Sequence, residues 1–136
     1  MYEKLLNLLN NSYCPYSNFR VSAIAIMNDL KEFSGVNVEN ASYGACICAE
    51  RSTIVSAISN GYKKGDFKSL HIMCGDSKVI STCCFLCRQV ILEFFSKDAS
   101  IFCYDKFGNF KEFKVKDLCP YPFEESDLKW NLDLLD

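Results

Sequence analysis

The sequence predicts an α/β sandwich built on a mixed sheet of about five strands. Two stretches with strand-like patterns near the start, 21–27 and 32–38, are separated by the turn-forming residues Asn28 and Asp29, which indicates a hairpin. Helical and strand patterns alternate after that hairpin, as in α/β folds. The chain has 136 residues, of which 49% are hydrophobic, so we expect one domain over residues 1–136 with an ample core.

The first half of the chain has two predicted helices. The first is expected over residues 2–10, which are rich in leucine, and Pro15 prevents its continuation. The second is expected over residues 48–62, where apolar side chains recur at the spacing i, i+3, i+4, i+7, and Gly61 can end it. The small and polar residues 37–46 predict a loop between the hairpin and this helix.

The second half continues the alternation. A short apolar run predicts a strand over residues 70–74, and an apolar stripe predicts a helix over residues 84–95. Two more strands are expected over 100–104 and 110–115, with a Gly-Asn turn between them. A short amphipathic helix is expected over 124–135.

The charge balance and the lack of long apolar runs exclude several classes of protein. Lys and Arg number 15 against 17 Asp and Glu, the net charge is −2 and the isoelectric point is about 5.4. Nucleic-acid-binding surfaces need a basic excess, so we expect no nucleic-acid partner. No apolar run is long enough for a membrane helix, and the N-terminus does not resemble a signal peptide, so we expect a cytoplasmic protein with no membrane partner.

The chain contains nine cysteines and a single histidine. His71 lies in a short apolar run, which favours a core histidine over a catalytic one. An odd number of cysteines without a secretory signal argues against a disulfide framework. The thiols are therefore expected to be small core side chains or metal ligands.

Three of these cysteines lie where two predicted helices begin. Cys48 starts one helix, and Cys84 and Cys87 lie in the first turn of the other. A helix N-terminus carries partial positive charge and favours thiolate. If the two helices pack side by side, three sulfurs and the carboxylate of Glu50 converge. Three sulfur ligands leave an open position on Zn²⁺, which is typical of catalytic sites, and a nearby carboxylate can carry protons there.

With these residues the chain resembles the homotetrameric cytidine deaminases of nucleoside salvage, whose zinc has three cysteine ligands. The resemblance runs from Tyr13 to Phe123, and its motifs are Tyr13–Val21, Ser34–Gly44, Cys48–Arg51 and Cys84–Val90. The match to the Asn-Val-Glu-Asn-Ala-Ser-Tyr segment is especially specific, because related deaminases with other substrates vary there. The resemblance implies a three-layer α/β/α sandwich, one Zn²⁺ per chain, and hydrolysis of cytidine and 2′-deoxycytidine to the uridines and ammonia.

The resemblance also implies roles for individual residues around the metal. Cys48, Cys84 and Cys87 would hold zinc, and Glu50 would be the catalytic proton shuttle. Arg51 would donate hydrogen bonds to the ligand thiolates and offset their negative charge.

Further residues are implied to bind the nucleoside. Phe19 would contact the base, and Asn37 and Glu39 would bind the ribose, particularly its 3′-hydroxyl. Other substrate contacts are implied for Asn40, Ala41, Tyr43 and Ala49. Phe123 would reach the pyrimidine bound by a neighbouring subunit, so that a homotetramer would share its active sites.

Three positions depart from the pattern of the family. Cys83 and Phe85 replace the proline and glycine that usually flank the second zinc ligand, and Ser22 replaces a glycine beside the Phe19 pocket. Phe85 cannot adopt positive φ cheaply, so the loop is expected to keep ordinary backbone angles. These departures bear on the shape of the pocket and leave the ligand spacing intact.

Four alternative functions remain open from the sequence. Cys46 could close the metal site as a fourth ligand and make it structural. The pair Cys84 and Cys87 could serve a thiol-disulfide oxidoreductase. A polynucleotide deaminase would share the zinc core but lacks the basic surface here. A deaminase of modified nucleosides, of the blasticidin type, is the nearest alternative.

Overall fold

A computed structural model describes residues 1–128 of the chain. Its centre is a five-stranded sheet with the strand order β2-β1-β3-β4-β5. The strands are β1 (Val21–Met27), β2 (Glu32–Val36), β3 (Phe67–Cys74), β4 (Phe95–Tyr104) and β5 (Phe110–Lys114). β3 and β4 pair in parallel, and the other neighbours pair antiparallel. The sheet is therefore mixed and five-stranded, which confirms the prediction.

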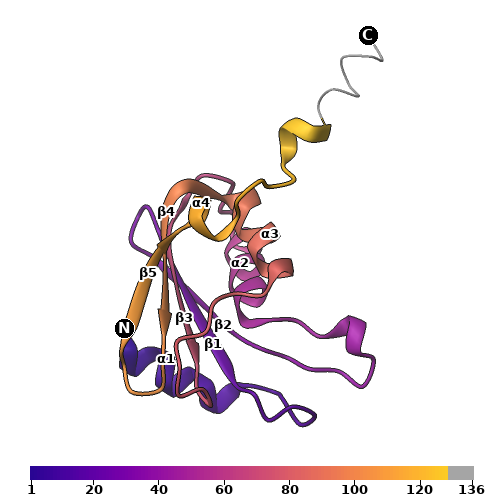
Figure 1. Ribbon diagram of the computed structural model, residues 1–136, viewed down its shortest axis with the longest axis vertical. Helices are drawn as coiled ribbons and strands as arrows, with labels where there is room; N and C mark the ends of the chain where they lie inside the picture. The colour runs from indigo at the N-terminus through magenta and orange to yellow at the C-terminus, as the bar shows by residue number, and fades with distance from the viewer. Residues whose placement is uncertain (129–136) are drawn as a thin grey trace.

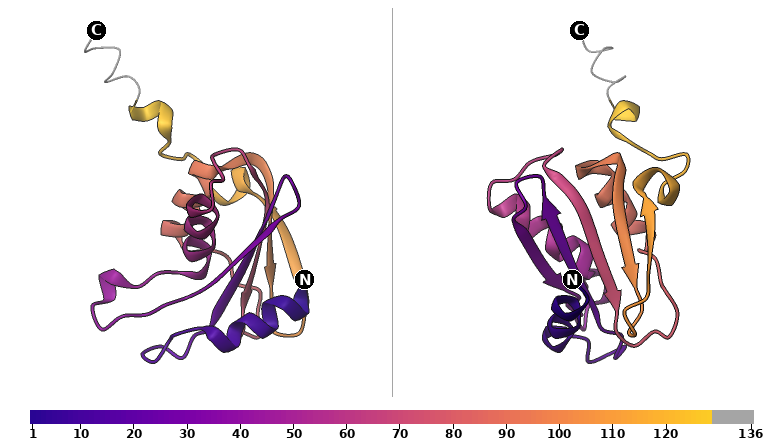
Figure 2. Two further views of the ribbon diagram at one scale, coloured as in Figure 1. Left: turned by 180° about the vertical axis from the view of Figure 1, so that it is seen from behind. Right: turned by 90° about the vertical axis from the view of Figure 1, so that its left-hand side faces the viewer.

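Helices lie on both faces of this sheet (Figures 1 and 2). One face carries α1 (Tyr2–Leu8), and the other carries α2 (Ala49–Ser59), α3 (Phe85–Phe94) and the short α4 (Val115–Leu118). The alternation of side chains along a strand produces both interfaces. In β1, for example, alternate residues serve different faces: Ala23 and Ala25 pack in the larger core with α2 and α3, whereas Ile24 packs with α1.

The end of α2 follows the sequence closely. Asn60 caps the helix, Gly61 has a φ of +94°, and the Tyr62 N–H donates to the Ala57 carbonyl. This is a Schellman ending, in which glycine takes the left-handed position that other residues avoid. Gly61 thus ends the helix as predicted, although the regular helix stops at Ser59.

Several boundaries differ from the prediction, among them the end of β2, which lies at Val36 instead of residue 38. β3 begins at Phe67 instead of residue 70, and β4 begins at Phe95 instead of residue 100, directly after α3. Residues 96–98 of β4 are exposed and polar, so the apolar pattern that marks a buried strand is missing there. The last strand ends at Lys114, and α4 follows it without a predicted signal.

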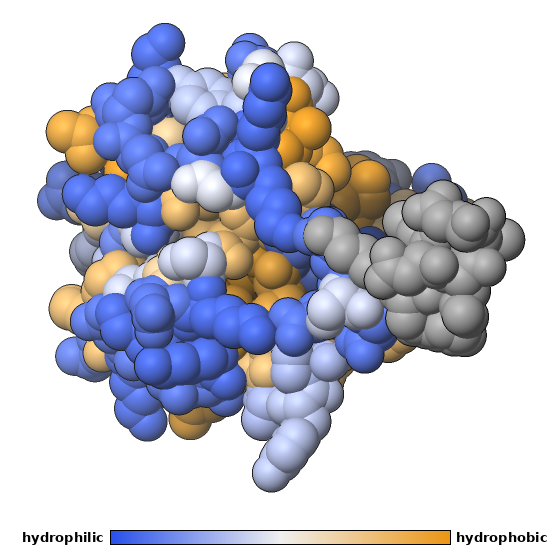
Figure 3. Space-filling view, turned by 90° about the horizontal axis from the view of Figure 1, so that it is seen from above, coloured by the Kyte–Doolittle hydropathy of each residue, from blue (hydrophilic) through white to orange (hydrophobic). Residues whose placement is uncertain are grey.

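The segment after α4 leaves the body of the molecule at one end (Figure 1). Residues 125–128 are helical, and the rest of the helix expected over 124–135 lies outside the described residues. Seen from this end, hydrophilic side chains surround a smaller apolar area (Figure 3). Among residues 1–128, none of the helices combines the length and the apolar character that a membrane crossing requires.

His71 is a core histidine, as expected. It lies in β3 and is 8% exposed, with its ring stacked on Phe102 at a centroid distance of 4.6 Å. Its Nδ1 lies 3.0 Å from the Tyr104 hydroxyl, and its Nε2 lies 3.3 Å from the Ser69 hydroxyl. These contacts lie on the α1 side of the sheet, so His71 takes no part in the metal site on the other side.

Candidate metal centre

Two helix N-termini bring three cysteines together. Cys48 is the N-cap of α2, Cys84 is the N-cap of α3, and Cys87 lies in the first turn of α3. The three sulfur atoms all lie within 4.8 Å of one another. The N–H of Cys87 donates to the Cys84 sulfur at 3.5 Å, so the cap interaction itself fixes one thiol. Cys87 is fully buried and Cys84 is exposed, so the cluster opens on one side.

This arrangement fits zinc. Zn–S bonds of about 2.3 Å at tetrahedral angles place two sulfurs about 3.8 Å apart. The sulfurs of Cys48 and Cys84 are 3.8 Å apart. Thiolate sulfurs, here from the N-terminal turns of two helices, also bind Zn²⁺ in preference to hard cations such as Mg²⁺ and Ca²⁺.

Arg51 places a positive charge against the same sulfurs. Its Nη2 donates to the Cys48 sulfur at 3.6 Å. A hydrogen bond from Cys87, followed by those from Arg51 and Cys84, lowers the pKa of the Cys48 thiol to about 5 against the opposing effect of burial. The same bond raises the pKa of Cys87, so the charge of the pair resides on Cys48. The cluster therefore carries the negative charge that a metal-cation site requires. The Arg51 guanidinium beside it stabilises that charge.

Glu50 lies in the first turn of α2, two residues after Cys48, and is 4% exposed. Burial raises the pKa of its carboxyl group, and the neighbouring Cys48 charge adds to this effect. A carboxyl group in such surroundings exchanges protons more readily near neutral pH than an exposed one. The first turn of α2 therefore brings the Glu50 carboxyl group, which can carry a proton, next to the thiol cluster.

A pocket of about 280 Å³ opens beside these groups. Two of the three thiols line it, those of Cys48 and Cys84, together with Glu50. The other lining residues are Ser17, Phe19, Val21, Asn37, Glu39, Ala49, Ile72, Cys74, Ser81 and Thr82. A pocket of this size suits one small molecule, and it borders the one cluster of three potential metal ligands found among the described residues.

Asn37 shapes the wall of this pocket. It follows β2 and is 9% exposed. Its Oδ1 accepts from the Val21 N–H at 2.9 Å, and its Nδ2 donates to the Phe19 carbonyl at 2.7 Å. One amide hydrogen and one oxygen lone pair stay free for another partner. Asn37 thus fixes the backbone of Phe19 and Val21, and its side-chain amide can still form hydrogen bonds with a ligand in the pocket.

Glu39 holds the neighbouring turn in the same way. One carboxylate oxygen accepts from the N–H groups of Tyr16 and Ser17, at 3.0 and 3.1 Å, and the other accepts from the Ser17 hydroxyl. These bonds lower the pKa of the Glu39 carboxyl, with the Ser17 hydroxyl as the largest cause. The carboxylate stays charged at neutral pH and can accept a further hydrogen bond from a ligand.

Four predicted substrate residues do not line the pocket of their own chain. Asn40, Ala41 and Tyr43 belong to the loop of residues 37–47, which extends away from the body of the molecule (Figure 1). Tyr43 is 75% exposed, and its ring lies edge-on to the ring of Tyr16. Phe123 is 59% exposed and lines a different groove, between α3 and the C-terminal segment.

Several lining residues were not predicted from the sequence. Ile72 and Cys74 alternate along β3 and reach the pocket at the end of that strand, where Cys74 was expected to be only a core side chain. Ser81 and Thr82 belong to the loop before α3. The alternation along β3, together with its position before the second cysteine motif, is the signal that could have found Ile72 and Cys74.

The side chains of Ser22 and Phe85, which depart from the family pattern, do not line the pocket. Ser22 is buried and donates to the Leu5 carbonyl at 2.8 Å on the α1 side, so the expectation that it lies beside the Phe19 pocket is wrong. Phe85 has no positive φ, as expected, and its ring lies 4.4 Å from the Arg88 guanidinium, on the surface. Strand alternation turns the Ser22 side chain to the other face of the sheet.

Cys46 does not join the metal cluster. Its sulfur accepts from the Asn40 N–H at 3.2 Å, inside the extended loop, and only Cys48, Cys84 and Cys87 group within ligand distance among the described residues. The alternative of a closed, structural zinc site therefore loses its fourth ligand.

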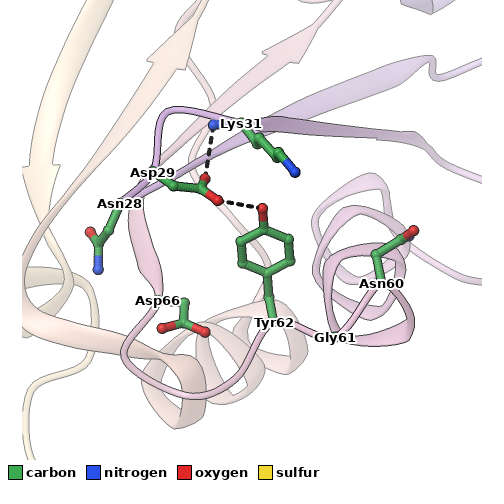
Figure 4. Close-up of a pocket in the computed structure, with 7 residues that line it drawn as sticks. All are labelled: Asn28, Asp29, Lys31, Asn60, Gly61, Tyr62 and Asp66. Carbon is green, nitrogen blue, oxygen red and sulfur yellow. Dashed lines mark hydrogen bonds between the residues drawn. The ribbon is translucent and has the colours of Figure 1, made fainter.

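A second and larger pocket, of about 450 Å³, lies at the opposite end of α2 (Figure 4). Its polar groups bond one another: the Tyr62 hydroxyl donates to Asp29 at 2.6 Å, and the Lys31 N–H donates to the same carboxylate at 3.0 Å. It has no cysteine or histidine in its lining, so we assign the chemistry to the smaller pocket.

Comparisons with known proteins agree with this geometry. The profile of the family described as "cytidine and deoxycytidylate deaminase zinc-binding region" matches residues 1–103. A cytidine deaminase of Mycoplasma genitalium is 33% identical over 124 residues, which cover 91% of this chain and 93% of the relative. A probable cytidine deaminase of Dictyostelium discoideum is 37% identical over 130 residues, 93% of this chain and 86% of the relative.

A solved structure extends the agreement to the fold. The crystal structure of cytidine deaminase from Burkholderia pseudomallei superposes with a TM-score of 0.85 at 36% identity and covers 90% of this chain and 95% of its own. The three thiols at two helix starts, the buried glutamate and these matches lead to one conclusion: the chain belongs to the zinc-dependent cytidine deaminase family.

Proposed function

We propose that the protein hydrolyses cytidine and 2′-deoxycytidine to uridine and 2′-deoxyuridine with release of ammonia. The observation that carries this proposal is the buried Glu50, which lines the same pocket as the thiols of Cys48 and Cys84. Relatives that carry the name cytidine deaminase and match about nine tenths of the chain support the same substrate class.

Cys48, Cys84 and Cys87 would hold one zinc ion, and its exposed side would face the pocket. When bound, zinc supplies the Lewis acidity that lets a water molecule lose its proton near neutral pH. Glu50 accepts that proton at its carboxylate, passes it to N3 of the base, and later helps protonate the leaving amino group. The oxygen of water adds at C4 of the pyrimidine, and ammonia leaves, so that cytidine and water become uridine and ammonia.

The pocket walls would orient the nucleoside. Asn37 and Glu39 keep unused hydrogen-bonding capacity, which suits the 3′-hydroxyl of the sugar. Phe19 also lines the pocket and offers an aromatic surface to the base. Arg51 keeps its positive charge beside Cys48 and offsets the negative charge of three thiolates.

A direct assay tests this function. Purified protein is loaded with zinc, its zinc content is measured, and cytidine is added while the ultraviolet absorbance of the pyrimidine and the released ammonia are followed. We expect equal amounts of absorbance change and ammonia from cytidine and from 2′-deoxycytidine. A zinc-loaded protein that leaves both nucleosides intact would overturn the proposal, and activity confined to a modified nucleoside such as blasticidin would redirect it.

The protein would act as a homotetramer whose subunits complete one another's sites. Tyr43 and Phe123 are exposed and do not line the pocket of their own chain, which supports a role in a neighbour's pocket. Stacking on the outer face of the pyrimidine would then come from the Phe123 ring of an adjacent subunit, an interaction worth about 0.5–1.5 kcal/mol beyond area burial.

Subunit mixing tests this assembly. Glu50→Gln chains and Phe123→Ala chains are co-assembled, so that some sites combine an intact Glu50 with an intact Phe123 from the other chain. We expect more activity than the average of the two parents, and a tetramer by light scattering. A fully active monomer would contradict the assembly, as would a mixture that only averages its parents.

Two further properties complete the proposal. We expect residues 1–136 to form one domain, which the single sheet and its shared core support. We also expect a cytoplasmic location, which is supported by nine cysteines that are all unpaired, because reducing compartments preserve free thiols.

A further inference from the structure

The segment that carries Phe123 makes few hydrogen bonds to the rest of the described chain. After α4, the residues Pro120 and Pro122 lack backbone donors, and Tyr121 between them has a φ of +52° and a fully exposed side chain. A non-glycine residue in the left-handed region is held there by its surroundings, because it would otherwise relax. Something on the body of the molecule must therefore fix the path of this segment.

Gln89 of α3 provides such a contact. Its Nε2 donates to the carbonyl oxygen of Phe123 at 2.7 Å. Within residues 1–128, this is the one hydrogen bond that the structure records between residues 120–123 and the remainder of the chain. The bond spans a groove of about 280 Å³ that is lined by α3 on one side and by residues 118–123 on the other.

The neighbouring Arg88 ties the start of this segment to the start of α3. Its guanidinium donates to the Leu118 carbonyl at 3.0 Å, where the segment begins, and to the Cys83 carbonyl and the Thr82 hydroxyl, both at 2.8 Å, where α3 begins. The segment therefore starts from a fixed point, and Gln89 determines where it passes next. Two ion pairs beyond Phe123, Lys97–Glu124 and Lys64–Glu125, are exposed and weaken with salt.

We propose that Gln89 is a positioning residue that holds Phe123 for the active site of the adjacent subunit. The inference rests on the proposed sharing of Phe123 between subunits. Because Gln89 follows Cys87 by two residues on α3, one helix then fixes a zinc ligand of its own site and the stacking ring of the neighbour's site. Loss of the hydrogen bond from Gln89 to Phe123 weakens nucleoside binding in the active site of the adjacent subunit and leaves zinc binding intact.

The variant Gln89→Met tests this role, since it keeps the length of the side chain and removes the donor. We expect the KM for cytidine to rise about threefold to tenfold, as for the loss of one hydrogen bond, with kcat and zinc content nearly unchanged. Gln89→Lys restores a donor of similar reach and should recover most of the loss. Glu93→Met, on an exposed position one turn further along α3, is the matched control and should leave KM unchanged.

Mixed assemblies distinguish a role in the neighbour's site from a role in the protein's own site. Gln89→Met chains are co-assembled with an excess of Glu50→Gln chains, so that turnover comes from sites whose neighbours hold Phe123 correctly. We expect the KM to return to that of the unaltered protein. A KM that stays raised would mean that Gln89 acts within its own pocket, which would overturn the inference.

The KM of the Phe123→Ala variant distinguishes the role of Gln89 from the sharing of Phe123 between subunits. If Phe123→Ala raises the KM and Gln89→Met does not, the inference about Gln89 is wrong and the sharing of Phe123 stands. If Phe123→Ala leaves the KM unchanged, the sharing of Phe123 is wrong, and the role of Gln89 is wrong with it. The double variant should be no worse than Phe123→Ala alone, because both changes remove the same contact.

Discussion

The sulfur atoms of Cys48 and Cys84 lie 3.8 Å apart although 36 residues separate the two cysteines in the chain. Each is the N-cap of a helix, and the two helices pack on the same face of the sheet. The sheet and the two helix starts thus hold the candidate metal ligands close together. Preorganised ligands lower the ordering cost of binding.

Zinc binding should depend on Cys87 and not on Cys46. Cys87→Ala removes a ligand that is fully buried in the cluster, so we expect loss of the metal. Cys46→Ser should retain one zinc per chain and most of the activity, because Cys46 bonds to the backbone of Asn40 and a hydroxyl can replace it there. Metal analysis of both purified variants checks the prediction. Loss of zinc from Cys46→Ser would favour a closed, structural site.

Selection for the nucleoside over the free base should be strong. Asn37 and Glu39 would be left with unpaired polar groups when the sugar hydroxyl is missing, and such sites discriminate by about 10⁴-fold or more. Cytosine and 3′-deoxycytidine should therefore be poor substrates, and 2′-deoxycytidine a good one. Substrate analogues are the cleaner probe, because replacing Asn37 also releases the backbone of Phe19 and Val21. Similar kcat/KM for cytosine and cytidine would exclude this role for the two residues.

The stability of the fold should fall in mild acid because of His71. Burial, with the nearby N-terminus, lowers the pKa of His71 to about 4. The pKa of histidine in an unfolded chain is about 6.5. Between pH 6.5 and pH 4, therefore, the unfolded chain binds a proton at this residue and the folded chain does not. The free energy of unfolding should therefore drop by about 1–2 kcal/mol between pH 7 and pH 5 from this residue alone.

Urea unfolding of the unaltered protein and of His71→Gln at both pH values measures this effect. Carboxylates with lowered pKa, such as Asp76 beside Arg20, act in the same direction in both proteins and cancel in the comparison. The variant should show the smaller loss of stability. Equal losses in the two proteins would mean that the folded chain accepts the proton on His71 without cost.

The elements that could be predicted from the sequence are those determined by local patterns. The starts of α2 and α3 follow from the apolar spacing after Cys48 and Cys84, and the end of α2 follows from Gly61. Because helix starts fix where first-turn side chains point, the convergence of three thiols with Glu50 could be anticipated as well.

Features that depend on distant contacts could not be predicted. The start of β4 is hidden, because exposed polar residues interrupt its apolar pattern. The hydrogen bonds of Asn37 and Glu39 join segments about 20 residues apart in the chain, and no local pattern encodes such pairs. Tyr43 was expected to contact the substrate, but its loop extends away from the body of the molecule and Tyr43 does not line the pocket, a path that no local pattern encodes.

The central claim is that Glu50 carries the proton in a zinc-dependent hydrolysis of cytidine, and the variant Glu50→Gln tests it most directly. The substitution keeps the size of the side chain and removes its ability to accept a proton. We expect kcat for cytidine to fall by about 10²–10⁴-fold, the contribution of general acid–base catalysis, with one zinc per chain and nearly unchanged nucleoside binding. Turnover close to that of the unaltered protein, in a variant with full zinc content, would contradict the claim.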